Sequence, residues 1–215
     1  MHRESTETQP DGRYDIRAVL CDVGGVLIHK KHTPALQQWA KSFHLETMEL
    51  VLSIWLCSSG RRAALGQASV EDVWREIQQI YALTETELEA FRHDFERSDY
   101  LDIEFVHFLQ GVRKDRKVAL LSNAWPDARY IFGDVFGLTT VSDMMILSCE
   151  EGLAKPDQRI YDLAAERLGF PHTSIVFIDD YPPNVSAAQA CGMHGIVYET
   201  REQTMAALHR LLYGS

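Results

Sequence analysis

The segment RAVLCDVGGV, residues 17–26, is a short apolar run that ends at Asp22 and continues into a Gly-Gly pair. This pattern predicts a buried strand that enters a tight turn. Four later segments have the same apolar character, at residues 117–121, 144–147, 174–178 and 195–198. Helical patterns accompany them at residues 104–112, 127–136, 157–168, 183–191 and 202–212. Strands that alternate with helices predict an α/β fold, in which helices cover both faces of a parallel sheet.

The interval between the first two strands breaks this alternation. It holds no convincing strand, and helices are expected at residues 34–43 and 47–56 and after two helix-start signals, at Ser69 and Thr84. We therefore predict a helical insert with its own small core at residues 32–99, between the core segments 15–31 and 100–215, after a flexible tail at residues 1–14. The alternative is a helix-rich edge of a single domain.

Composition excludes several classes of protein. The 215 residues carry 31 acidic and 21 basic side chains, a net charge of −10, which argues against nonspecific nucleic-acid binding. We expect no membrane span, because no apolar run reaches about 18 residues. The polar N-terminus lacks the apolar core of a secretory signal, so we expect a cytoplasmic protein. The widely spaced Cys21, Cys57, Cys149 and Cys191 are expected to be free thiols rather than zinc ligands.

Polar side chains follow the predicted strands at the ends where ligands bind in open parallel sheets. They are Asp22, Ser122, Asn123, Asp179, Asp180 and Asn184, and Lys155-Pro156 precedes the helix before the Asp179 strand. Each has an ordinary alternative reading, as a turn residue, a helix cap or start, or a solvated lysine. Their joint occurrence at matching positions predicts a site for a phosphate and a divalent cation. Hard oxygen ligands suit Mg²⁺, and lysine neutralises phosphate.

The order of these motifs resembles that of the haloacid dehalogenase-like (HAD) hydrolase superfamily. The matching motifs are Asp22-x-Gly-Gly-Val, Leu-Leu-Ser122-Asn, Lys155-Pro-Asp and Phe-Ile-Asp179-Asp180-x-x-x-Asn184. The resemblance spans residues ~16–200 and implies a Rossmann-like core. The helical insert lies where members with an α-helical cap carry theirs, as in the phosphatase domain of soluble epoxide hydrolases and in bacterial sugar-phosphate phosphatases.

The resemblance also implies a role for each matching residue. Asp22 would be the nucleophile that forms an aspartyl-phosphate, and Lys155 would offset the charge between nucleophile and phosphate. Ser122 and the amide of Asn123 would hold phosphate oxygens. The magnesium ligands would be Asp22, the backbone carbonyl of Gly24 and Asp180, with Asp179 and Asn184 beside them.

The sequence departs from the superfamily's phosphatases at Gly24, where they usually carry a second aspartate that protonates the leaving group. Such general acid catalysis is typically worth about 10²- to 10⁴-fold in rate. His29, His32 or a cap residue could supply the proton instead, although a solvated basic loop is the alternative for the two histidines. Arg61-Arg62 is interpreted as a surface pair in a loop, or as a contact for an anionic substrate. Trp39, Trp55 and Trp74 are expected in the cap core, with contact to the substrate as the alternative.

These observations predict a magnesium-dependent hydrolase of a small organic phosphomonoester, with no nucleic-acid or membrane partner. Two alternatives stay open. One is a carbon–halogen hydrolase that uses Asp22, although dehalogenases typically lack an acidic pair such as Asp179-Asp180. The other is a phosphate-binding or interaction module that has lost turnover along with the second aspartate. The sequence does not indicate the oligomeric state.

Overall fold

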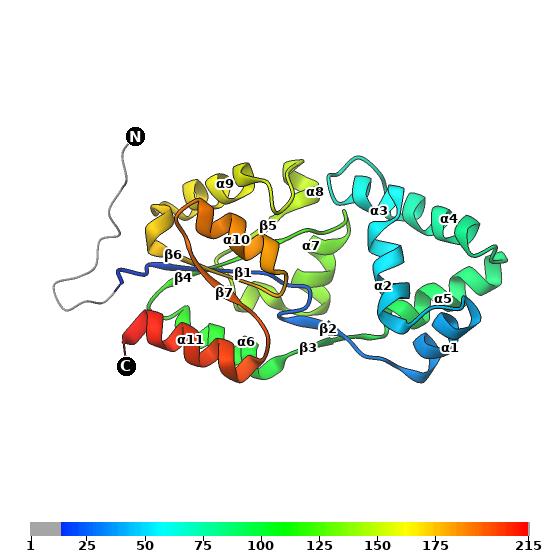
Figure 1. The fold of residues 1–215 in the computed structure, drawn as a ribbon, viewed down its shortest axis with the longest axis horizontal. Coiled ribbons are helices and arrows are strands. Elements are labelled where there is room, and N and C mark those ends of the chain that lie inside the picture. The colour runs from blue at the N-terminus through cyan, green and yellow to red at the C-terminus, as the bar shows by residue number, and fades with distance from the viewer. Residues whose placement is uncertain (1–13, 215) are drawn as a thin grey trace.

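A computed structural model describes residues 14–214 and shows a sheet-containing core beside a helical insert (Figure 1). The core holds a five-stranded parallel sheet in the order β5-β4-β1-β6-β7. Its strands are β1 (Ala18–Cys21), β4 (Lys117–Ser122), β5 (Met144–Leu147), β6 (Ile175–Asp179) and β7 (His194–Val197). The chain builds outward on one side of β1 and then on the other, as in Rossmann-like sheets. The predicted α/β class and all five predicted strands are confirmed.

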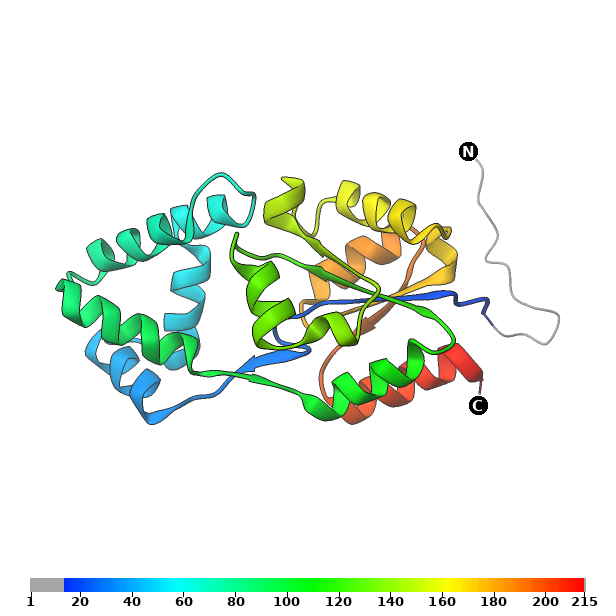
Figure 2. The same ribbon diagram turned by 180° about the vertical axis from the view of Figure 1, so that it is seen from behind.

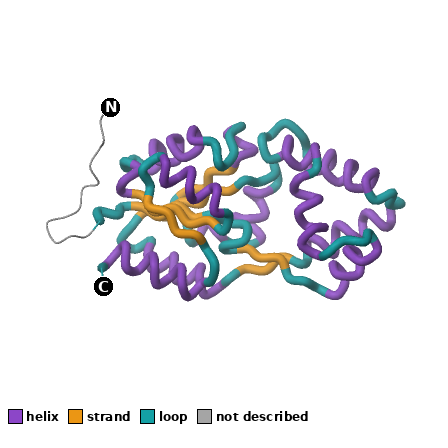
Figure 3. The backbone as a smooth tube through the Cα atoms, viewed as in Figure 1, coloured by secondary structure: helices purple, strands orange, loops and turns teal. Residues whose placement is uncertain are grey.

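Alternation along the strands gives the sheet two buried faces. Val19 and Cys21 point into the cluster that includes α6 (Ile103–Val112) and α11 (Arg201–Tyr213). Ala18 and Leu20 point into the opposite cluster, with α9 (Gln158–Leu168) and α10 (Pro182–Ala190). The two helix pairs lie on opposite sides of the sheet (Figure 3). Because both faces are covered, the strands are apolar throughout, and polar residues appear only where they end.

The insert is built from five helices around a separate cluster of buried side chains. They are α1 (Pro34–Ser42), α2 (Thr47–Leu56), α3 (Ser58–Ala63), α4 (Val70–Ile80) and α5 (Glu85–Glu96). The start signals at Ser69 and Thr84 are both capping boxes, completed by Asp72 and Glu87. The side chains of each pair satisfy backbone amides that a helix N-terminus otherwise leaves unpaired.

Two short strands join the insert to the core, where the sequence predicted none. They are β2 (Ile28–Lys30) and β3 (Asp99–Leu101), which pair antiparallel with Ile28 opposite Leu101 (Figure 2). Three residues are too few to show the alternation that identifies a strand, and the partner lies about seventy residues away in sequence.

One other local prediction was wrong, and another was right in extent but not in helix type. Arg61 and Arg62 lie in helix α3 rather than in a loop, and their guanidinium groups donate to the carbonyls of Leu56 and Gln67. The helix predicted at residues 127–136 is a short α7 (Ala128–Tyr130) that continues as a π-helix over Ile131–Val135. The remaining short elements are α8 (Ser148–Glu151) and 3₁₀ turns at Leu138–Thr140 and His172–Ser174.

All four cysteines are free thiols; Cys21 and Cys57 are buried, as expected, whereas Cys149 and Cys191 are only half-buried. The predicted tail at residues 1–14 lies outside the described residues except for Tyr14. Within residues 14–214, no helix combines the length and apolar character needed to span a membrane.

Candidate active site

The sheet brings predicted residues from two strands together around Lys155. Asp22 directly follows β1, Asp179 ends β6, and Lys155 enters from the loop between α8 and α9. The Lys155 ammonium lies 2.8 Å from Oδ1 of Asp22 and 2.6 Å from Oδ2 of Asp179. Its side chain is 1% exposed, so Lys155 is not a solvated loop lysine. The buried cation therefore connects the two carboxylates.

Asp179 has its hydrogen-bonding capacity filled by neighbouring groups. Its Oδ1 accepts from the backbone N–H of Tyr181 at 2.8 Å, and Nδ2 of Asn184 lies 3.1 Å from each of its oxygens. With Lys155 on Oδ2 as well, the carboxylate is fully buried and fully bonded. Asp179 and Asn184 therefore position the lysine, and the Asp179 carboxylate has no free oxygen, whereas Asn184 also lines the cavity.

Asp22, Asp180 and the Gly24 carbonyl keep oxygens that a cation could use. Carboxylate oxygens of Asp22, Asp179 and Asp180 lie within 4.8 Å of one another. Among residues 14–214, no other residue donates a hydrogen bond to the carboxylate of Asp180, and no backbone N–H reaches the Gly24 carbonyl. Hard oxygens at this spacing, unsatisfied by protein donors, fit a magnesium ion that shares its remaining positions with water and substrate.

Gly25 allows the close approach of Asp180. Its φ is +75°, in the left-handed region, and a Cβ built there would lie 2.1 Å from Oδ2 of Asp180. Both the backbone conformation and the space therefore require glycine. The second glycine of the motif serves to bring Asp180 against the turn that follows Asp22.

The charges in this cluster are unbalanced. Burial raises the pKa of Asp22 to about 7, Lys155 opposes this shift, and the neighbouring Asp179 charge adds to it. Burial and the Asp179 charge also raise the pKa of Asp180. Burial lowers the pKa of Lys155, but its two carboxylate partners outweigh burial and the net shift is upward. Three carboxylates thus face one ammonium, and a divalent cation would offset the excess negative charge.

Ser122 and Asn123 occupy different positions relative to the cavity. Ser122 ends β4, is 3% exposed and lines the cavity beside Asp22. The side-chain amide of Asn123 instead makes two hydrogen bonds to the backbone of Lys155, at 2.8 and 2.9 Å. That amide fixes the lysine loop, so the expected phosphate contact of Asn123 falls to its backbone N–H.

A cavity of about 610 Å³ extends from these residues toward the helical insert. Its walls come from α2, α4 and α5 of the insert, from the strands β2 and β3, and from the α7 region of the core. His29 on β2 lines the cavity together with Gly24 and Asp180, whereas His32 and Arg61-Arg62 do not. Of these four basic side chains, only His29 lines the cavity.

Trp125 joins the core to the insert, and sequence reasoning missed it. It lies three residues after Ser122, yet it is 6% exposed within the hydrophobic cluster of the insert. Its indole N–H donates to the Gly60 carbonyl at 3.1 Å, and its ring lies 4.2 Å from that of Trp55. The sequence did offer a signal for Trp125, because a large aromatic residue that soon follows a strand-end motif and belongs to no helical pattern needs a packing partner elsewhere.

Trp55 corrects another expectation. It was predicted in the cap core, but it is 36% exposed and lines the cavity. Trp74 is buried in the insert cluster and Trp39 packs against it, as expected.

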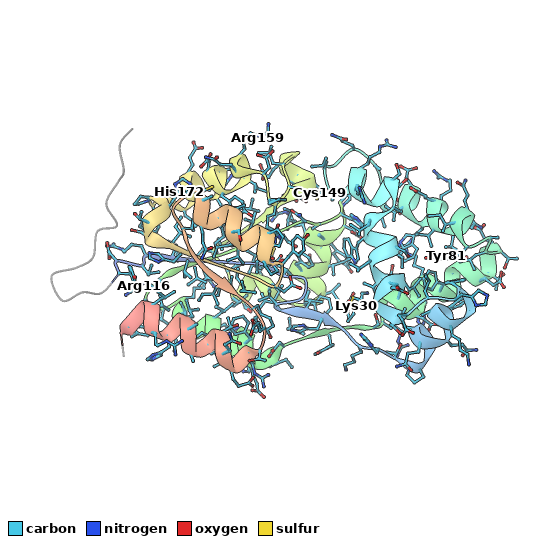
Figure 4. The ribbon with its side chains drawn as sticks, viewed as in Figure 1. Lys30, Tyr81, Arg116, Cys149, Arg159 and His172 are labelled. Carbon is cyan, nitrogen blue, oxygen red and sulfur yellow. The ribbon has the colours of Figure 1, made fainter. Side chains whose placement is uncertain are left out.

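Lys30 forms a second junction between the two parts of the molecule (Figure 4). Its ammonium lies 3.0 Å from Asp99 on the paired strand, donates to the Phe95 carbonyl at 2.7 Å, and sits 3.5 Å above the Phe95 ring. These contacts connect the two strands to the C-terminal end of α5.

The fold and this cluster define a class of proteins. The haloacid dehalogenase-like hydrolase family matches residues 16–192, so the chain belongs to that family and is a hydrolase.

Known relatives agree with this assignment. A phosphatase of Mycobacterium tuberculosis is 30% identical over 121 residues, which is 50% of this chain and 55% of that protein. The matched part of the chain spans between 6% and 55% of the length of the curated relatives that it matches. A HAD-like hydrolase structure from Porphyromonas gingivalis superposes with a TM-score of 0.72 at 25% identity, covering 94% of this chain and 100% of that one. A Bacteroides thetaiotaomicron HAD enzyme in complex with magnesium and inorganic phosphate shares the fold, with a TM-score of 0.67 at 21% identity over 85% and 93% of the two chains.

Proposed function

We propose that this hydrolase is a magnesium-dependent phosphatase of a small organic phosphomonoester. The observation that carries the proposal is the buried Asp22–Lys155–Asp179 arrangement, with the carboxylate of Asp180 beside it, to which no other residue donates among residues 14–214. The names of the relatives also support it, because one is a phosphatase and one was solved with magnesium and phosphate. The acidic pair argues against a metal-free dehalogenase.

In the proposed reaction, a carboxylate oxygen of Asp22 attacks phosphorus while the bond to the leaving oxygen breaks. Lys155 holds Asp22 in place at 2.8 Å and offsets repulsion from the phosphate dianion. Ser122 and the backbone N–H of Asn123 hold phosphate oxygens. Water then attacks phosphorus, which releases phosphate and restores the Asp22 carboxylate. Magnesium, held by Asp22, Asp180 and the Gly24 carbonyl, would supply further charge neutralisation during transfer.

We also propose that residues 32–99 act as a cap over a core formed by residues 15–31 and 100–215. The separate hydrophobic cluster of the insert and its position across the cavity support this division. The junctions at Lys30 and Trp125 would transmit cap closure to the site.

The first test is hydrolysis of phenyl phosphate with Mg²⁺, compared between the wild type and Asp22→Asn. The substitution keeps the shape and removes the attacking oxyanion, so turnover should fall at least about a thousandfold. The matched control is Asp115→Asn, an exposed aspartate in the turn before β4, at the opposite end of the sheet. Wild-type turnover by Asp22→Asn contradicts the nucleophile assignment. Release of halide from a 2-haloacid, with no phosphatase activity, supports the dehalogenase alternative.

A further inference from the structure

We propose that the leaving group of the substrate is apolar and uncharged, an aryl group or hydrocarbon chain, and that its far end passes out of the cavity along helix α2. This inference rests on the proposed phosphatase function and names the substrate class. Three observations carry it: the side chains of the cavity walls, the pairing of the nearby cations, and the exposed face of α2.

The cavity walls beyond the phosphate end are largely hydrocarbon and aromatic. From the insert they comprise Met48, Val51, Trp55, Val70, Trp74 and Phe95. From the core, the walls include Ile131, Phe132 and Phe136, and Ile28 lies at the junction. A sugar or other polyhydroxylated leaving group would lose its hydration against such walls without enough replacement hydrogen bonds. An apolar group would gain free energy from the same transfer.

Two of the three basic side chains near these walls, Lys30 and Lys155, are already paired with carboxylates. Among the described residues, Lys30, His29 and the catalytic-end Lys155 are the basic side chains that line the cavity. The Lys30 ammonium is held by Asp99, the Phe95 carbonyl and the Phe95 ring. Glu96 and Asp127 add carboxylates to the same walls. A second phosphate or a carboxylate on the leaving group would therefore meet more negative than available positive charge.

The apolar surface continues outward along α2. Met48 and Trp55 line the cavity and are nevertheless 49% and 36% exposed, so they lie at its mouth. Leu52 and Leu56 are 47% and 52% exposed and follow Met48 at intervals of four residues, on the same helix face. This row of apolar side chains extends the cavity wall over the surface. It suits a hydrocarbon chain longer than the cavity.

The test uses para-substituted phenyl phosphates with one leaving-group chemistry and different tails. The series is phenyl, 4-butylphenyl and 4-hexylphenyl phosphate, each below its micellar concentration. Two further compounds carry a tail of butyl length that ends in a carboxylate or in a trimethylammonium group. A fully buried methylene contributes about fourfold in binding. We expect kcat/KM to rise at least about tenfold from phenyl to butylphenyl and to rise further for hexylphenyl. Both charged tails should lose that gain. A flat series overturns the proposal, as does a preference for either charged tail.

Variants locate the tail. Met48→Glu places a charge at the mouth, in the first turn of α2 where a carboxylate suits the helix dipole. It should reduce the ratio of hexylphenyl to phenyl kcat/KM at least about fivefold. The matched control is Ile80→Glu, which alters another exposed apolar residue of the insert, 52% exposed and away from the cavity. An equal ratio in Met48→Glu and wild type contradicts the α2 path. Asp22-dependent turnover of phenyl phosphate without chain-length dependence refutes this inference alone, whereas no turnover of any phosphomonoester refutes the proposed function.

Discussion

Replacing Trp125 should lower both the stability of the fold and the affinity of the site for substrate, because this residue follows a core strand but its side chain is buried in the insert. Trp125→Ala removes a ring that is 6% exposed, its contact with the Trp55 ring, and the hydrogen bond to the Gly60 carbonyl. Truncation of a buried aromatic side chain costs about 3–5 kcal/mol. Trp125→Phe keeps a ring but removes the indole donor to the Gly60 carbonyl, which retains its hydrogen bond from the Ala64 backbone N–H, so the expected cost is about 0.5–1.5 kcal/mol. Urea denaturation followed by circular dichroism measures both losses.

The matched control for Trp125 is Trp39→Ala. The Trp39 indole N–H donates to Asp94 at 2.9 Å, so that hydrogen bond joins α1 to α5 within the insert. Both Trp→Ala variants should lower the free energy of unfolding, but only Trp125→Ala should raise KM for phenyl phosphate, because Ser122 lies three residues earlier. A stability loss below about 1 kcal/mol for Trp125→Ala, or identical kinetics for the two variants, would refute the assigned role.

Three further results are expected at the strand ends. Gly25→Ala should weaken Mg²⁺ binding, measured by calorimetry, far more than Gly24→Ala does. A Cβ at position 25 would lie 2.1 Å from Oδ2 of Asp180, whereas nothing lies within 4 Å of a Cβ at position 24. Gly24→Asp, which has that open space, should raise turnover of alkyl phosphates by up to about 10²- to 10⁴-fold while aryl phosphates change little, and equal gains for both would contradict a leaving-group role. In metal-free protein, Asp22→Asn should raise Tm near pH 8, because burial holds the pKa of Asp22 at about 7 and folding above that pH buries a charge. The gain should vanish below about pH 4, where the carboxyl is protonated in both folded and unfolded states; a gain independent of pH would contradict this origin.

The sequence alone determined the sheet and the residues gathered at its edge. Strands buried on both faces must be apolar over their whole length, so Asp22, Ser122 and Asp179 mark their ends as soon as polarity returns. Helices α4 and α5 of the insert were equally readable, because the side-chain hydrogen bonds of their capping boxes lie within four residues of sequence, whereas α3 was missed. These are local signals, and they were sufficient to predict the fold class and to bring the candidate residues into one site.

The tertiary structure decided what each of those residues can do. Asp179 and Asp180 are adjacent in sequence, but Lys155 and Asn184 occupy the oxygens of the first and leave the second free. The side-chain amide of Asn123 is likewise taken up by hydrogen bonds, in this case to the backbone of Lys155. The pairing of β2 with β3 and the insertion of Trp125 into the insert likewise depend on partners more than sixty residues away. Hydrogen-bond saturation and burial depend on which groups the fold brings together, whether near in sequence, as Tyr181 and Asn184 are to Asp179, or far away, as Gly60 is from Trp125, and the sequence pattern does not say which of them meet.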